Sequence, residues 1–181
     1  MRQTLTIVAT IMMLASCGSK EQQQTIHIAA PIIQEVNGIQ RMSDYFYTDT
    51  VHHRGAKWEY TIVRLANDTA DVVTDSDGQQ YAGNTISLTV NRNGQQILAK
   101  AFTKRTLGDY VDAKFLRANI LEGMAYHKTV PEGICFAVSV GLPLSDEYVQ
   151  VRLTVHPDGS YSMRRDEIVD DNLAFDDSLG V

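Results

Sequence analysis

The chain has 181 residues, of which 44% are hydrophobic, and this length suits one folded domain with a core of its own. Its 16 lysine and arginine residues against 22 aspartate and glutamate residues give a formal charge of −6. Nucleic-acid binding needs a basic surface, so we expect no nucleic-acid partner.

The first twenty residues have the layout of a bacterial export signal that ends at a lipid-attachment site. Arg2 gives a positive start, residues 5–14 are mostly apolar, and Ala15 and Ser16 precede Cys17. This order resembles the lipobox of bacterial lipoproteins, in which the cysteine is acylated and becomes the mature N-terminus. The apolar run is shorter than the ~20 residues of a spanning helix, so we predict membrane contact through lipid on Cys17 only.

These signals divide the chain into four predicted parts. Residues 1–16 are a lipoprotein signal peptide, and residues 17–24 form a flexible polar tether. Residues 25–165 form a single β-rich domain, and the acidic residues 166–181 fray. The residues after Cys17 lack the aspartate commonly linked to inner-membrane retention, which favours the outer membrane, on its periplasmic face or at the cell surface.

The first half of the domain shows strand patterns. Residues 25–36 suit a short strand or an extended arm, because Pro31 disfavours a helix. Residues 58–65 are rich in aromatic and β-branched side chains and predict a strand. Asn67-Asp68 predicts a turn before a short strand over residues 70–74.

The next segment predicts a turn and a hairpin. Asp75-Ser76-Asp77-Gly78 is typical of a tight turn. Residues 85–90 alternate between apolar and polar side chains, as in a strand with one buried face. Asn93-Gly94 then predicts a hairpin into residues 95–102.

One helix is predicted after this hairpin. Asp109 or Asp112 can cap its start, and Gly123 suits its end. An apolar stripe follows helical spacing and should pack on the sheet. The stripe consists of Val111, Phe115, Ala118 and Leu121, widened by Leu116 and Ile120.

Further strands are predicted over residues 124–129, 134–142 and 148–156, and Pro157-Asp158-Gly159 turns into residues 160–164. Strands do not alternate with helices, which argues against a nucleotide-binding α/β fold. We therefore predict a mainly β (α+β) fold. It would be an antiparallel, meander-like sheet or sandwich of seven to eight strands with one inserted α-helix.

Several short motifs, together with the N-terminal signal, resemble one known family. They are residues 81–88 (YAGNTISL), 101–104 (AFTK), 110–116 (YVDAKFL), 121–126 (LEGMAY) and 156–160 (HPDGS). Over residues 55–165 the chain resembles the family catalogued as domain of unknown function 4738, lipoproteins of gut-type Gram-negative bacteria. The resemblance implies the same envelope address. The family has no assigned activity, so no catalytic residue transfers.

Four aromatic residues are candidates for contact with a glycan or another partner: Trp58, Tyr60, Tyr45 and Tyr47. Aromatic rings offer a large contact area together with a polar group, which suits binding surfaces. The alternative is that these rings fill the core near the N-terminal strands.

Three triplets of the form Asp-Ser/Thr-apolar resemble an O-glycosylation acceptor used on exported proteins of such bacteria. Their acceptor residues are Thr50, Thr69 and Ser178, and the first two are expected in exposed turns. Because so short a pattern also arises by chance, the triplets are a hypothesis.

No metal and no cofactor are expected. Histidine and cysteine show no zinc-type spacing, and His52-His53, adjacent in a strand, would point to opposite faces. In Asp75-Ser76-Asp77-Gly78 the glycine comes too early for a calcium loop. Cys135 lies in an apolar run and is predicted to be a small buried side chain rather than a reactive thiol.

The function we expect is a non-enzymatic binding or interaction module for an envelope or extracellular protein or glycan, because catalytic motifs such as Gly-x-Ser-x-Gly are absent. One alternative is a small hydrolase or transferase acting on envelope glycan or peptide. It would use a perturbed acid or histidine in a cleft, drawn from Asp112, His127 or His156. Another is a carrier that closes over a small apolar ligand.

Overall fold

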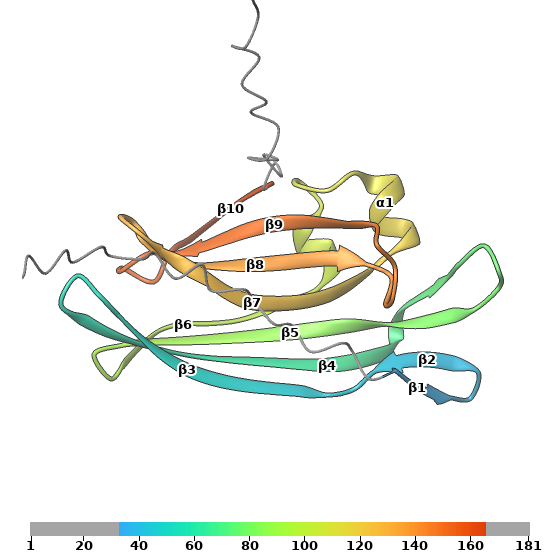
Figure 1. Cartoon of the computed structure of the whole chain (residues 1–181), viewed down its shortest axis with the longest axis horizontal. Coiled ribbons are helices and arrows are strands. Elements are labelled where there is room, and N and C mark those ends of the chain that lie inside the picture. The colour runs from blue at the N-terminus through green and yellow to red at the C-terminus, as the bar shows by residue number, and fades with distance from the viewer. Residues whose placement is uncertain (1–32, 166–181) are drawn as a thin grey trace, which may run out of the picture.

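The computed structural model describes residues 33–165, which form a two-layered β-sandwich with one short α-helix (Figure 1). A six-stranded sheet has the order β1-β2-β5-β4-β3, with β6 also paired to β5, and a four-stranded sheet has the order β10-β9-β8-β7. The strands are β1 (Ile33–Val36), β2 (Ile39–Met42), β3 (Tyr45–His53), β4 (Ala56–Thr74), β5 (Gln80–Arg92), β6 (Gln95–Phe102), β7 (Ile120–Val130), β8 (Gly133–Gly141), β9 (Tyr148–Val155) and β10 (Tyr161–Arg165).

The predicted fold class is confirmed in its sandwich form, and residues 33–165 contain ten strands in place of the seven or eight expected. Nearly all strand pairs are antiparallel, but β2 pairs in parallel with β5 through Ile39–Gln80 and Gln40–Tyr81. The β1–β2 hairpin accounts for much of the difference in strand number. β1 lies within residues 25–36, where the sequence predicted a strand or an arm, and β2 follows them as an additional strand.

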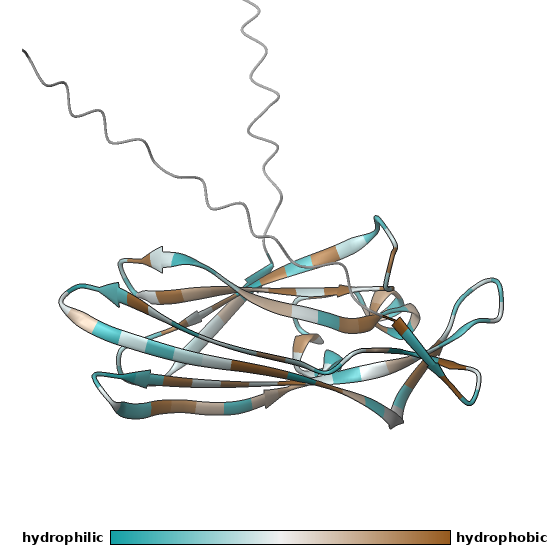
Figure 2. Cartoon of the chain, turned by 60° about the horizontal axis from the view of Figure 1, so that its bottom comes forward, coloured by the Kyte–Doolittle hydropathy of each residue, from teal (hydrophilic) through white to brown (hydrophobic). Residues whose placement is uncertain are grey.

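Alternating side chains build the core between the two sheets, as the brown and teal bands along the strands in Figure 2 indicate. Ile86, Leu88 and Val90 of β5 are fully buried, as are Leu153 and Val155 of β9. Each such aliphatic side chain contributes roughly 1.5–3 kcal/mol when removed from water. The two buried faces therefore hold the layers together.

The predicted hairpin at Asn93-Gly94 is confirmed. Both residues have positive φ, 51° and 81°, as a type I′ turn requires. Asn93 also fixes the neighbouring hairpin, because its Oδ1 accepts from the Lys57 N–H at 2.8 Å and its own N–H donates to the Lys57 carbonyl. Asn37-Gly38 and Arg54-Gly55 show the same pair of positive φ angles.

The turns at the two other predicted positions are also present. The Asp75 Oδ1 atom accepts from the N–H groups of Asp77 and Gln79 between β4 and β5. Gly159 adopts a φ of 85° between β9 and β10, and its N–H donates to the His156 carbonyl oxygen.

The turn predicted at Asn67-Asp68 is wrong. β4 continues through this position to Thr74, with a bulge between Asn67 and Val72. The pairing with β5 shifts register at this bulge and resumes at Val72–Ala82, so one long strand replaces the two predicted short ones. Gly83 on the paired strand gives the bulge its space, because a Cβ there would lie 2.7 Å from the Asp71 Cβ.

The helix is shorter than predicted. α1 spans Ala113–Ala118, preceded by a short 3-10 helix, η1 (Lys104–Leu107). The Asp112 cap is confirmed: its Oδ1 accepts from the N–H groups of Lys114 and Phe115.

The predicted end of the helix at Gly123 is wrong, because the chain becomes extended at Asn119. Ile120 and Leu121 then enter β7, where both are 1% exposed. No residue of α1 itself is buried, although Phe115 and Leu116 pack partly on the core. Burial of Ile120 and Leu121 in the sheet thus decides where the helix stops.

Several predictions fall outside the described residues. They are the predicted signal peptide (residues 1–16), the predicted tether (residues 17–24) with its proposed lipid attachment at Cys17, and the acidic residues 166–181 with the candidate Ser178. Among residues 33–165, no helix is both long and apolar enough to cross a membrane.

Candidate functional site

The four aromatic candidates are divided between the surface and the core. Tyr45 and Tyr47 on β3 are each 40% exposed, whereas Trp58 and Tyr60 on β4 are 1% and 2% exposed. β4 lies between β3 and β5, and its inward side chains face the second sheet. Trp58 and Tyr60 therefore belong to the core and are withdrawn as direct partner contacts.

The two exposed tyrosines form the outer end of an aromatic cluster. The rings of Tyr45 and Tyr47 lie almost parallel, at 9°, with centroids 6.2 Å apart. Tyr47 is also 6.2 Å from Tyr60, whose ring lies 5.5 Å from Tyr126 and 5.2 Å from Phe136. Contacts of this geometry are favourable between aromatic rings, so the exposed pair is supported by the core. We call Tyr45, Tyr47 and Asp49 the tyrosine surface.

Polar contacts fix both exposed rings. The Arg64 guanidinium lies 5.7 Å from the centroid of the Tyr45 ring, and Arg64 itself donates to the Ser43 and Glu122 carbonyl oxygens at 3.1 and 3.0 Å. The Tyr47 hydroxyl donates to Asp49 Oδ2 at 3.1 Å. Rings held in place before binding lose less side-chain entropy when a partner arrives.

The phenols of Tyr47 and Tyr60 stay protonated at neutral pH. Desolvation, followed by the hydrogen bond to Asp49, raises the pKa of Tyr47. Desolvation and then the Asp49 charge raise the pKa of Tyr60 much further. The tyrosine surface therefore offers two apolar ring faces, the protonated Tyr47 hydroxyl group and the Asp49 side chain, a set suited to binding a partner.

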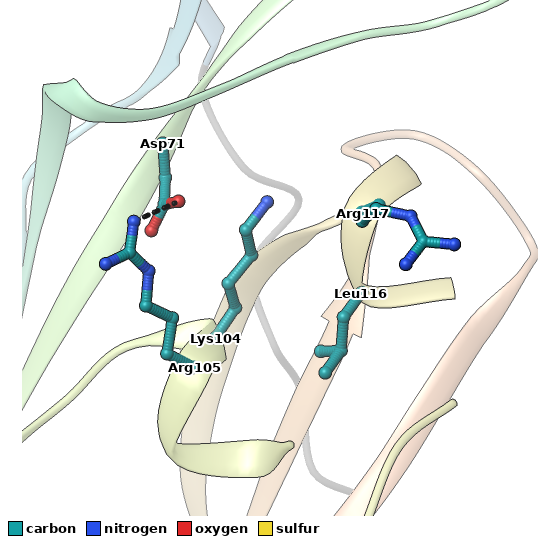
Figure 3. Close-up of a pocket in the computed structure, with 5 residues that line it drawn as sticks. All are labelled: Asp71, Lys104, Arg105, Leu116 and Arg117. Atoms are coloured by element: carbon teal, nitrogen blue, oxygen red, sulfur yellow. Dashed lines mark ion pairs between the residues drawn. The ribbon is translucent and has the colours of Figure 1, made fainter. Parts of the chain in front are cut away.

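A pocket of about 310 Å³ lies elsewhere, where η1 and α1 approach the bulge of β4 (Figure 3). Its lining consists of Asp71, Lys104, Arg105, Leu116 and Arg117. An adjoining pocket of about 110 Å³ shares Asp71 and Arg105. The pattern of residues in the sequence did not reveal these pockets, because their walls come from three separate elements.

A family model described as domain of unknown function (DUF4738) matches residues 25–163, well over half of the chain. The chain belongs to this family. The DUF4738 resemblance found in the sequence is thereby confirmed, and the matched region begins earlier than the resemblance did. No curated protein matches the chain.

Two residues of the enzyme alternative, Asp112 and His156, lie at opposite ends of the smaller sheet in this DUF4738 domain. Asp112 caps α1 beside the start of β7, whereas His156 follows the far end of β9. The nitrogens of His156 lie 3.2 Å from the Glu132 carbonyl oxygen and 3.1 Å from Ser162 Oγ. His127 lies within β7 and has contacts of its own.

Glu122 has a perturbed pKa, and the sequence pattern did not identify it as a candidate site residue. Desolvation raises the pKa of Glu122 on β7, while Arg64 and then Ser139 act in the opposite direction. Glu122 lines neither of the two pockets described above. Its strand position was hidden because the sequence placed it in the helix.

The described residues hold no cluster of metal ligands and no exposed cysteine. Within residues 33–165, no group of three or more histidine, cysteine, aspartate or glutamate side chains is placed to hold a metal ion. Cys135 is fully buried, as predicted, and its Sγ lies 3.3 Å from Thr154 Oγ1.

The two candidate glycosylation residues within residues 33–165, Thr50 and Thr69, do not lie in turns. Thr50 is an exposed residue within β3, and Thr69 falls within the long strand β4. The prediction of a turn is therefore wrong at both residues, because the chain forms strands there, whereas the predicted exposure of Thr50 is confirmed. The Thr50 triplet remains accessible on the edge strand of the sheet.

Proposed function

We propose that this DUF4738 domain is a non-enzymatic binding module, anchored to the cell envelope by lipid on Cys17, that binds an envelope or extracellular protein or glycan. The lipobox and the polar tether in the sequence support this location in the cell envelope. The lack of an aspartate after Cys17 favours the outer membrane.

The observation that carries the binding proposal is the exposed and ordered pair Tyr45 and Tyr47. Large exposed aromatic side chains on a fixed backbone are typical of partner contacts, where rings supply much of the binding energy. The pair lies on β3, which within residues 33–165 has β4 as its neighbour on one side only. A partner can therefore approach the ring faces and the strand edge together.

Phe46 adds to the same strand from the opposite face. It is 71% exposed and pairs with Val63, which is half-buried. Thr50, on this outer face of β3, stays a candidate for glycan attachment.

The carrier alternative has less support. Such a carrier needs an apolar cavity between its sheets. Trp58, Tyr60, Phe102 and Phe136 are among the largest fully buried side chains, and they occupy the space between the two layers.

The test is binding of the full-length protein to isolated envelope polysaccharide and, separately, to envelope protein. We expect the variant Tyr45→Ser/Tyr47→Ser to lose binding by about tenfold or more, because aromatic side chains dominate such interfaces. The control is Tyr148→Ser on β9, which removes a tyrosine of similar exposure, 48%, from the other sheet.

The control should bind as the unchanged protein does, and the thermal unfolding temperatures of all three proteins should stay close. Equal binding by the double variant would remove the tyrosine surface from the site. Turnover of an envelope glycan or peptide by the purified protein would overturn the non-enzymatic proposal.

A further inference from the structure

The pocket between η1, α1 and the β4 bulge carries an excess of positive charge. Three of its five lining residues are cations, Lys104, Arg105 and Arg117, against the single carboxylate of Asp71. The whole chain has the opposite balance, with a formal charge of −6. A cationic pocket on an acidic protein favours anions locally over the rest of the surface.

Lys104 is the central cation of this pocket. It is half-buried, and its Nζ donates to the Asn119 carbonyl oxygen at 3.2 Å. Desolvation lowers its pKa, and Arg105 lowers it further, while Asp71 acts in the opposite direction. An ammonium has three donors, and a charged acceptor placed beside it would offset the cost of its burial.

Arg105 is held only loosely by Asp71. Its Nη2 lies 3.7 Å from Asp71 Oδ1, beyond ordinary hydrogen-bond length, and the arginine side chain is well exposed. Its guanidinium group therefore keeps donors for an incoming oxyanion. Guanidinium groups match the oxygen geometry of phosphate and sulfate through paired N–H donors.

The two remaining walls come from α1. Leu116 is half-buried and gives the pocket an apolar side. Figure 3 shows the Arg117 guanidinium turned away from Lys104, on the far side of α1. The positive charge inside the pocket therefore comes from Lys104 and Arg105.

The backbone positions this charge set. Lys104 and Arg105 are neighbours in η1, directly after β6. Asp71 reaches the pocket because the β4 bulge passes over Gly83, where a Cβ would lie 2.7 Å from the Asp71 carbonyl oxygen. Any side chain at residue 83 would push Asp71 away.

We propose that this pocket binds a phosphate-type oxyanion, free or as the terminal group of a sugar, with Lys104 and Arg105 as its primary ligands. The site does not depend on the tyrosine surface. β3 forms one edge of the larger sheet, whereas β6, which leads into η1, pairs with β5 on the opposite side.

The test is calorimetric titration of the full-length protein with inorganic phosphate and, in a second arm, with glucose 6-phosphate. We expect saturable binding, and the arm with the lower Kd tells whether the oxyanion is bound free or carried on a sugar. Lys104→Met and Arg105→Gln should each weaken binding by about tenfold, because each removes a charged donor.

Asp71→Asn is the decisive variant, because it removes the negative charge that faces the anion and frees Arg105. It should strengthen phosphate binding several-fold, a gain that misfolding does not produce. The matched control is Lys114→Gln, an exposed cation of α1 that does not line the pocket.

The control should bind phosphate as the unchanged protein does. The proposal would be overturned by no binding in either arm. Equal weakening by Lys114→Gln and Lys104→Met would also overturn it, since that result means attraction to general charge. Weaker binding by a well-folded Asp71→Asn would do the same.

Discussion

Tyr60 links the tyrosine surface to the core of the sandwich. Its ring meets Phe136 edge-on at 82° and lies near that of Tyr126, while its hydroxyl lies 3.4 Å from Asp49 Oδ2 on the edge strand. The same carboxylate accepts from the exposed Tyr47. The buried Tyr60 thus supports the position of the exposed Tyr47, because their rings pack together and both hydroxyl groups lie near Asp49 Oδ2.

The pKa of Tyr60 predicts how stability changes at alkaline pH. The folded protein raises this pKa above the ordinary value of 10.0, chiefly by desolvation, so the unfolded chain releases its proton first. Below pH 10 this contribution to the free energy of unfolding is fully present, and it is lost as pH rises further. Urea unfolding followed from about pH 8 to pH 11.5 should show the midpoint falling above about pH 10.

Tyr60→Phe keeps the ring and removes the ionisable group, so its midpoint should fall less steeply over the same range. Tyr126, whose pKa is also raised by desolvation, accounts for part of the remaining slope. Identical slopes for the two proteins would show that Tyr60 does not resist ionisation.

Sequence identified the aromatic residues but not which of them are exposed. Tyr45 and Tyr60 both lie in strands and both alternate toward the second sheet. The difference is that β3 is an edge strand and β4 is an interior strand, which depends on pairing between distant parts of the chain. Local patterns carry no information about such pairing. For the same reason the sequence did not show that Tyr126 joins the aromatic cluster beside Tyr60.

Among the elements, turns were easier to predict than the helix. Asn93-Gly94 is a residue pair that strongly favours positive φ at both positions, so its hairpin is encoded locally. The Asp112 cap is also local, and it is confirmed. The end of the helix depends on competition between a longer helix and the strand β7. Ile120 and Leu121 fit the apolar stripe of a helix, but they are buried almost completely in β7.

The hairpin turn predicts a specific effect on stability. Gly94 adopts a φ of 81°, a conformation that costs other L-residues about 1–2 kcal/mol. Gly94→Ala should therefore lower the free energy of unfolding by about 1 kcal/mol, measured by urea denaturation.

The control is Gly108→Ala at the end of η1, where φ is −58° and alanine fits without strain. This change should stay within about 0.5 kcal/mol of the unchanged protein. Equal effects at the two glycines would show that the turn conformation does not limit stability.

At the scale of the whole molecule, alternation of apolar and polar residues was enough to predict a β-rich fold. The division of ten strands into sheets of six and four was not predictable, because it depends on which non-neighbouring strands face each other. The cationic pocket is a product of this assembly. Asp71 and Lys104 are far apart in sequence and meet only where the bulge, η1 and α1 converge.

The proposed lipid on Cys17 determines whether the whole protein is attached to the membrane. Acyl chains stabilise membrane attachment by about 0.8 kcal/mol per buried CH₂ group, so loss of the acylated residue should release the protein. We expect Cys17→Ser to abolish incorporation of labelled palmitate and to move the protein out of the membrane fraction. The control is Cys135→Ser, because that thiol is buried in the core.

Labelling should persist in the control variant. Palmitate retained by the Cys17→Ser protein would contradict the predicted attachment site. The proposed location in the cell envelope would then lose its main support.

The central claim is that this domain binds its partner through β3 and the tyrosine surface. Hydrogen–deuterium exchange of the full-length protein, with and without the envelope fraction that it binds, tests that claim most directly. We predict slower exchange at the amides of residues 45–49, because a partner covers the free edge and the two rings. Unchanged exchange in β3 together with new protection on other strands would contradict it.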